Sequence, residues 1–229
     1  MAAMVAEFAD RRDARAEDVE RVVGMDSVLQ RLEELAGSVR VEALSITPGV
    51  QSTHTISAGL RNNADLLARN VTIRAAMQES ARNDRATSEY AKSLTDAGGE
   101  VRTAPVLPPR MLISDRATAV VPIDPVDTQA GVLVLTGRGV VTSLCTLFEQ
   151  VWSTAVPLGA AQSKERQGVT PTERELLNLL GQGHTDESAA KRLGLSERTC
   201  RRMMADLMER LGARSQFEAG LLAAREGWI

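Results

Sequence analysis

The strongest constraint on the fold is a series of helix starts and stops within residues 170–229. Thr170 precedes Pro171, and this order is typical of a helix start, because a hydroxyl caps the first amides and proline suits the first helical position. Glu173 completes a capping box with Thr170. A second start follows at Ser196 and a stop at Gly212. These signals predict an all-α domain of four short helices.

Two of these helices form a tight pair. A helix over 186–193 and one over 196–211 are joined by Gly194, which suits a left-handed turn. Small residues at the expected contact make the pair typical of a helix-turn-helix motif. On the second helix, the residues predicted to face inward are Cys200, Met203, Leu207 and Leu211; those left facing outward include Arg198, Arg201, Arg202 and Ala205.

An outward arginine near the start of such a helix can bond two acceptors of a guanine or neutralise a phosphate. The helix start at Ser196 and Thr199 also presents backbone N–H groups to a phosphate. The alternative for Arg201 and Arg202 is a solvated face on an ordinary helical bundle.

Residues 39–158 follow another pattern, in which short β-like runs alternate with helical ones. This alternation predicts an α/β domain with a mixed sheet and flanking helices. The expected strands are 41–46, 71–77, 101–104, 110–115, 118–123 and 131–135, and the expected helices are 60–69, 86–97 and 140–156. Residues 1–38 are predicted to form an N-terminal helical arm, with Asp26 capping a helix that runs to Leu35. A linker is expected at 159–168, and the helical domain at 169–229.

Composition excludes several classes of protein. The net charge is −3 and 43% of the residues are apolar, a share that disfavours a disordered chain. The sequence contains no apolar run long enough to span a membrane, and we expect no secretory signal. Two isolated cysteines and two isolated histidines predict neither disulfide nor metal site, and we expect no cofactor and a cytoplasmic protein. Basic and acidic residues balance within 170–229, so non-specific binding to nucleic acid should be weak.

The segment from GVTPTERELL to the end of the chain resembles the LuxR-type (GerE-like) helix-turn-helix domain. The matching residues are Thr170, Glu173, Leu177, Ser196, Thr199, Leu211 and Gly212. The resemblance implies that Arg201 and Arg202 contact bases and that Thr199 contacts a phosphate. The set of DNA-binding residues expected on this basis is Ser196, Arg198, Thr199, Arg201, Arg202 and Ala205. This sequence departs from the family pattern at Cys200, Met203 and Arg210, which puts the target sequence in doubt.

The middle segment, around GGEVRTAPVLPPRMLISDRATAVVPIDP, resembles the phospholipase-D-like domain of TrmB-type and LuxR-type regulators of actinobacteria. Catalytic members of that superfamily carry H-x-K-x4-D. Aligning Asp115 with the aspartate puts Pro108 at the histidine position and Arg110 at the lysine position. Proline can neither attack phosphorus nor transfer a proton, so we expect no enzyme activity. Arg110, Ser114 and Asp115 could line a vestigial ligand pocket for an anion. The alternative is a structural ion pair or a solvated strand edge.

Together these features predict a transcription regulator that binds double-stranded DNA as a homodimer on an inverted repeat. The helix over 196–211 would contact the bases, and a ligand or partner at the middle domain would modulate binding. Contact with RNA polymerase is a further hypothesis, and the sequence identifies no effector. The competing hypothesis is a small-molecule-binding or interaction module whose helical tail contacts proteins rather than DNA.

Overall fold

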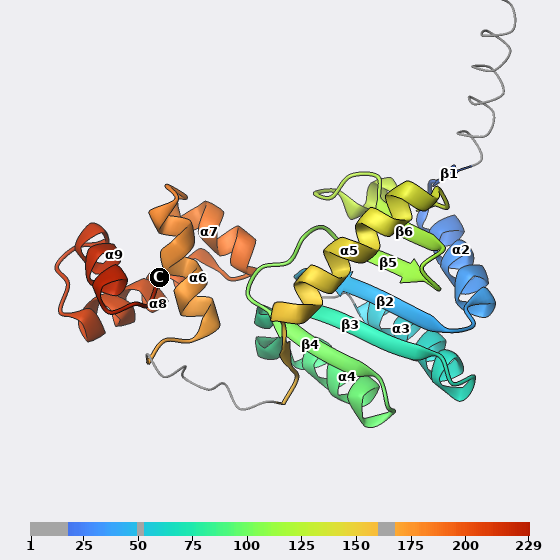
Figure 1. The fold of residues 1–229 in the computed structure, drawn as a ribbon, viewed down its shortest axis with the longest axis horizontal. Coiled ribbons are helices and arrows are strands. Elements are labelled where there is room, and N and C mark those ends of the chain that lie inside the picture. Colours follow the sequence, from blue (N-terminus) through green and yellow to red (C-terminus); the bar gives the residue numbers. More distant parts are fainter. Residues whose placement is uncertain (1–17, 50–52, 160–167) are drawn as a thin grey trace, which may run out of the picture.

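The computed structural model describes residues 18–49, 53–159 and 168–229, and these residues form two lobes (Figure 1). The larger lobe is an α/β domain built on one sheet, and the smaller is a bundle of helices drawn in orange and red. The fold class predicted from the sequence, a mixed sheet with flanking helices followed by a helical domain, is confirmed. None of the described helices is long and apolar enough to cross a membrane.

The sheet of the α/β domain has the strand order β1-β7-β6-β5-β2-β3-β4-β8. Strands β2, β3 and β4 are parallel, and every other neighbouring pair is antiparallel. The strand bounds are Val19–Val22, Glu42–Thr47, Thr72–Gln78, Glu100–Ala104, Met111–Ser114, Thr118–Pro122, Val132–Leu135 and Val156–Pro157, from β1 to β8. Because β5 runs antiparallel to β2, the start of β5 lies at the carboxyl ends of the parallel strands.

Helices cover the two faces of the sheet unequally. Helix α5 (Arg138–Thr154) crosses one face, whereas α3 (Thr53–Ala68) and α4 (Arg85–Asp96) lie behind the other (Figure 1). Helix α2 (Met25–Ser38) packs against α3. The short 3-10 helix η1 (Glu79–Asn83) follows β3. Another, η2 (Thr128–Ala130), precedes β7.

The alternation of side chains along β3 supplies both layers of core. Ile73, Ala75 and Met77 face α3 and α4, whereas Ala76 faces α5. Under α5 the largest fully buried side chain is that of Phe148, which stacks on Trp152 with ring centroids 5.5 Å apart. The buried residues of α5 recur at helical spacing, so one face of this helix packs on the sheet: Val141, Cys145, Phe148 and Trp152.

The prediction of a helical arm over residues 1–38 is right for Met25–Ser38, which form α2, and wrong for Val19–Val22. Residues 19–22 form β1, which pairs antiparallel with β7 at the edge of the sheet, with Val19 opposite Leu135. Asp26 is not the N-cap; Gly24 occupies that position, and α2 continues to Ser38, past Gly37. Val19, Val22 and Val23 suit this strand and its end, because β-branched residues favour extended backbone. Residues 1–17 lie outside the described part, as do 160–167 of the expected linker.

The C-terminal domain contains α6 (Pro171–Gly181), α7 (Asp186–Leu193), α8 (Glu197–Leu211) and α9 (Gln216–Arg225). The capping box predicted at Thr170 is present: the Thr170 hydroxyl accepts from the N–H of Glu173, and the Glu173 carboxylate accepts from the N–H of Thr170. The core of this domain is separate from that of the sheet domain and includes Leu176, Leu193, Cys200 and Leu207.

Candidate functional site

The turn between α7 and α8 is held by the residues that the sequence singled out. Gly194 has φ of +62° and caps the carboxyl end of α7, a conformation that costs a side-chain-bearing residue energy. The Ser196 hydroxyl accepts from the N–H of Thr199 at 3.2 Å and caps α8. The two hydroxyls of Ser196 and Thr199 lie 2.8 Å apart at the start of this helix. The predicted helix-turn-helix is therefore present.

Helix α8 divides into a buried face and an exposed one. Cys200, Met204 and Leu207 are at most 2% exposed. Met203, which we expected to face inward, is only half-buried, and Met204 takes its place in the core. Among the predicted DNA-contacting side chains on the helix, that of Thr199 is half-buried. The others are exposed: Arg198, Arg201, Arg202 and Ala205. The structure thus brings the predicted residues together on the first turns of one helix.

Arg201 has acidic neighbours that the sequence reasoning missed. Its guanidinium pairs with Glu197 on the same helix, and its Nε lies 3.6 Å from Asp186 Oδ2 at the start of α7. The Arg201 side chain remains 64% exposed, so these pairs are weak and exchangeable. Within the described residues, Arg198 and Arg202 have no hydrogen bond or ion pair. The spacing of Glu197 and Arg201, four residues apart on a helix, is the signal that could have revealed the first pair.

The residues of the predicted ligand pocket in the sheet domain do not converge. Arg110 precedes β5 and Asp115 follows it, so the two charges lie at opposite ends of the strand and form no ion pair. Ser114, the last residue of β5, sits beside Asp115 at the end away from Arg110. The prediction of one pocket from these three residues is therefore wrong, because they were grouped by sequence distance although an extended strand separates its ends.

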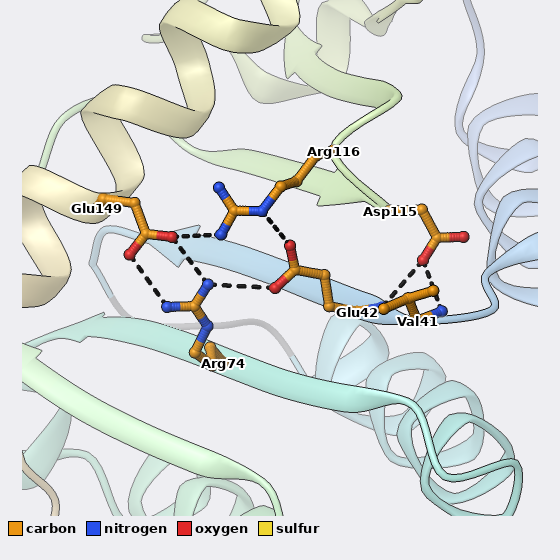
Figure 2. Close-up of polar contacts among 6 residues, drawn as sticks. All are labelled: Val41, Glu42, Arg74, Asp115, Arg116 and Glu149. Carbon is orange, nitrogen blue, oxygen red and sulfur yellow. Dashed lines mark hydrogen bonds and ion pairs between the residues drawn. The ribbon is translucent and has the colours of Figure 1, made fainter.

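Asp115 has a structural role at its end of the strand. Its carboxylate accepts from the backbone N–H groups of Arg40 (2.8 Å), Val41 (2.8 Å) and Glu42 (2.9 Å), as Figure 2 shows in part. Burial would raise the pKa of Asp115, but these three donors outweigh it and lower the pKa. Asp115 thus fixes the start of β2, and its φ of +49° places it in the left-handed region.

Arg110 occupies a different environment, at the carboxyl ends of the parallel strands. Burial lowers the pKa of the Arg110 guanidinium. The positive charge of Arg110 in turn favours the ionised form of the Tyr90 hydroxyl on α4. That hydroxyl accepts a hydrogen bond from Asn63 Nδ2 of α3 at 2.8 Å. Burial raises the pKa of Tyr90, so the phenol stays protonated at neutral pH. Among the described residues Arg110 has neither hydrogen bond nor ion pair. It is therefore a half-buried cation at the edge of the sheet where α/β domains bind ligands.

A network of four charges under α5 was not predicted. Arg74 on β3 pairs with Glu42 on β2 at 3.2 Å and with Glu149 on α5 at 2.9 Å, and Arg116 pairs with both carboxylates (Figure 2). Hydrogen bonds from Arg74 and Arg116 lower the pKa of Glu149 to about 2. Arg74 also lies over the ring of Phe148, 5.2 Å from its centroid. The network joins α5 to the sheet across long sequence distances, so no local signal could have revealed it.

Comparison with known proteins gives a family for the C-terminal domain. Residues 167–223 match the family model of bacterial regulatory proteins of the luxR family (GerE). The C-terminal domain is therefore a LuxR-type helix-turn-helix domain. The chain is also 34% identical, over 156 residues, to the bialaphos biosynthetic pathway regulatory protein of Streptomyces hygroscopicus. That alignment covers 68% of this chain and 61% of the relative, so the chain spans less than two thirds of the relative's length.

Two solved structures resemble the sheet domain in fold. One is Nuc from Salmonella typhimurium, a phospholipase D family member, with 13% identity, 62% of this chain and 99% of that chain covered, and a TM-score of 0.50. The other is NucT from Helicobacter pylori, with 12% identity, 61% and 98% coverage, and a TM-score of 0.52. At these identities the likeness concerns the fold alone. The predicted phospholipase-D-like fold of the middle domain is confirmed.

Proposed function

We propose that this protein is a DNA-binding transcription regulator whose helix α8 contacts base edges in the major groove. The observation that carries the proposal is the exposed face of α8 within a LuxR-type domain, where Arg198, Arg201 and Arg202 occupy the first two turns. Arginines at these positions can bond the two major-groove acceptors of guanine. Double-stranded DNA is therefore the proposed partner.

The remaining α8 residues have positioning roles in this proposal. The N-terminus of the helix, at Ser196 and Thr199, directs backbone N–H groups toward a phosphate. Ala205 leaves room on the same face for the groove wall or a thymine methyl group. Arg198 and Arg202, which lack partners among the described residues, are available at once, whereas Arg201 must leave Glu197 and Asp186.

The proposal includes a homodimer on an inverted repeat. Helix α9 supports it, because Phe217 is 78% exposed and Leu221 is 50% exposed, and residues four apart lie on the same face of a helix. A second copy with the same face would bury both side chains and place two α8 helices on half-sites about 34 Å apart. Contact of the bound dimer with RNA polymerase is part of the same proposal.

The sheet domain acts in this proposal as a sensor without catalytic activity. Pro108 stands where the phospholipase D pattern requires the histidine nucleophile, and proline offers no atom for that chemistry. Arg110 and the Tyr90 hydroxyl supply a cation and a hydrogen-bond donor for an anionic effector. Absence of phosphodiesterase turnover in the purified chain, and loss of effector binding in Arg110→Ala, are the expected results.

One observation favours the competing function of a protein-interaction module. The exposed Phe217 and Leu221 suit contact with a protein rather than with DNA. In that case α8 would have no preference among DNA sequences. The two functions are separated by whether the chain selects a duplex from a random pool.

The test begins with selection of bound duplexes from a randomised pool by the full-length chain, followed by gel shift on the selected site. Arg201→Ala/Arg202→Ala should weaken specific binding at least tenfold, because each base-contacting pair contributes about 1–3 kcal/mol. The control is Arg85→Ala, which removes a 92% exposed arginine from α4 in the sheet domain. Unchanged affinity in the double variant, with an unchanged melting temperature, would contradict the assignment.

A further inference from the structure

Arg201 on helix α8 lies between two carboxylates that come from different helices. Glu197, one turn earlier on α8, accepts a hydrogen bond from Nη2 of the Arg201 guanidinium. Asp186, at the start of α7, places its Oδ2 3.6 Å from Nε of the same guanidinium. The remaining nitrogen, Nη1, has no hydrogen bond among the residues that the structure describes. Part of the guanidinium therefore faces acids, and Nη1 is left for another acceptor.

The buried thiol of Cys200 lies close to both carboxylates. Burial raises the pKa of this thiol, and the negative charges of Asp186 and Glu197 raise it further. Both acids lie in the first turn of their helices, where the helix dipole favours negative charge. The two carboxylates therefore flank the first turn of α8, at the end that is proposed to enter the major groove.

The neighbouring charges of α8 are arranged differently. The side chains of Arg198 and Arg202 are exposed and make no ion pair or hydrogen bond within the described part of the chain. Asp206 and Glu209 are exposed as well, and within the same residues their carboxylates contact no cation. Among the described residues, Arg201 is thus the arginine of this face that two acids surround.

Two acceptors on one guanidinium restrict how it can turn. A free arginine side chain samples many rotamers, and it loses this freedom when it binds a base. Arg201 has lost part of that freedom before binding, because its Nε and Nη2 atoms face acceptors. A guanidinium has more N–H groups than two carboxylates occupy, so others remain for the O6 and N7 acceptors of guanine. The acids therefore prepare Arg201 for a guanine.

The same two acids reduce the attraction of Arg201 for phosphates. One guanidinium and two carboxylates together carry a net charge of −1. Phosphates of the DNA backbone attract positive charge whatever the base sequence, so this cluster weakens sequence-independent binding. The edge of a guanine is uncharged and is bound through hydrogen bonds that the acids leave available. The acids should therefore affect the two kinds of binding unequally.

The strength of these ion pairs depends on the water around them. In the free protein they are weak, because the Arg201 side chain is 64% exposed. Entry of α8 into the groove removes water, and the attraction between the charges increases as the local dielectric constant falls. The acids therefore act most strongly on Arg201 when DNA is bound.

We propose that Asp186 and Glu197 determine sequence specificity, because they position Arg201 for a guanine and offset its charge toward phosphates. The inference rests on the proposed function, since it presupposes that α8 enters the major groove. It adds two positioning residues, neither of which contacts a base, and it assigns a guanine to Arg201 in each half-site.

The test uses the full-length chain and the variant Asp186→Asn/Glu197→Gln, which removes both charges and keeps the side-chain shapes. Dissociation constants are measured for the duplex selected by the wild type and for a scrambled duplex of equal composition. We expect the variant to bind the scrambled duplex about tenfold more tightly, with a steeper dependence on salt, because negative charge near the phosphates is lost. Its affinity for the selected duplex should change by at most about threefold, since lost positioning offsets the lost repulsion.

The matched control is Asp206→Asn/Glu209→Gln, which removes the same two charges from exposed positions of α8 that do not contact Arg201. It should tighten binding of both duplexes by a similar factor and leave their ratio unchanged. Should the first double variant melt below the wild type, Glu197→Gln replaces it, because that side chain is 44% exposed. We expect the ratio of the two affinities to fall about threefold in this single variant.

A separate selection from the random pool with Arg201→Ala tests the assigned base. The preference for guanine should disappear at one base pair of each half-site; its retention there would refute the assignment. Equal tightening of both duplexes in Asp186→Asn/Glu197→Gln would reduce the acids to general repulsion and overturn the inference, as would unchanged affinity for both. If the wild-type chain selects no duplex at all, the proposed function fails first, and the inference fails with it.

Discussion

The two domains differ in how far along the chain their fixing contacts reach. In the C-terminal domain, Thr170, Ser196 and Ser215 each cap a helix by accepting from an N–H three residues ahead. In the sheet domain, Asp115 accepts from amides 73 to 75 residues earlier, and Arg74 pairs with Glu149. A domain whose helices are capped by residues close in sequence can be predicted from short sequence patterns. A domain held by contacts between residues far apart in sequence can be predicted only once its strand order is known.

The largest expected effect tests whether the two cores are independent. Phe148→Ala should destabilise the sheet domain by about 3–5 kcal/mol, because the ring is fully buried and its loss leaves a cavity under α5. Urea unfolding should show the loss in the transition reported by Trp152, while the one reported by Trp228 in the C-terminal domain stays in place. Equal shifts of both transitions would mean that the domains unfold as one unit.

A smaller effect compares a distant cap with a local one. Asp115→Ala should cost about 2–3 kcal/mol, because three backbone N–H groups lose a charged acceptor and alanine is disfavoured at positive φ. Thr185→Ala, which removes the local cap of α7, should cost only about 1 kcal/mol. Both values come from urea unfolding at pH 7. Equal losses of unfolding free energy in the two variants would contradict the view that contacts between distant residues hold the sheet domain more strongly than local caps hold the C-terminal domain.

The smallest effect concerns pH. The pKa of Glu149 is about 2 in the folded protein, below the ordinary value of 4.5, so the carboxylate stabilises the fold fully above about pH 5. This stabilisation is lost as the pH falls from about 4.5 through 2. Since the side chain is 40% exposed, solvent screening should keep the effect near 1 kcal/mol or less. The difference in unfolding free energy between wild type and Glu149→Gln should narrow over that range; a constant difference would contradict the ion-pair assignment.

Element positions in both domains could be predicted from the sequence, but the pairing of strands that lie far apart in the chain could not. The strand expected at 71–77 is β3, displaced by one residue, and the helix expected at 86–97 is α4. Nothing in residues 19–22 indicates that they pair with β7, more than a hundred residues later. The two-residue strand β8 exists only because β4 offers it a partner. Edge strands therefore escaped prediction.

The same distinction explains the outcome for the candidate sites. Arg198, Arg201 and Arg202 lie on one helix, where spacing alone determines the face, and the structure places them together. Arg110 and Asp115 are almost as close in sequence, yet they lie at opposite ends of strand β5. The contact of Gln78 with Arg192 joins residues 114 positions apart, beyond any local pattern.

The strand order places the first and last strands of the sheet domain at opposite edges of the sheet, a fixed distance apart. The described chain enters at β1, on one edge, and leaves toward the C-terminal domain from β8, on the other. Eight strands spaced about 4.8 Å apart separate these edges by roughly 34 Å. Fluorophores placed beside Val19 and in the C-terminal domain would thus start from a fixed baseline, and any change in energy transfer would report movement of the helical domain alone.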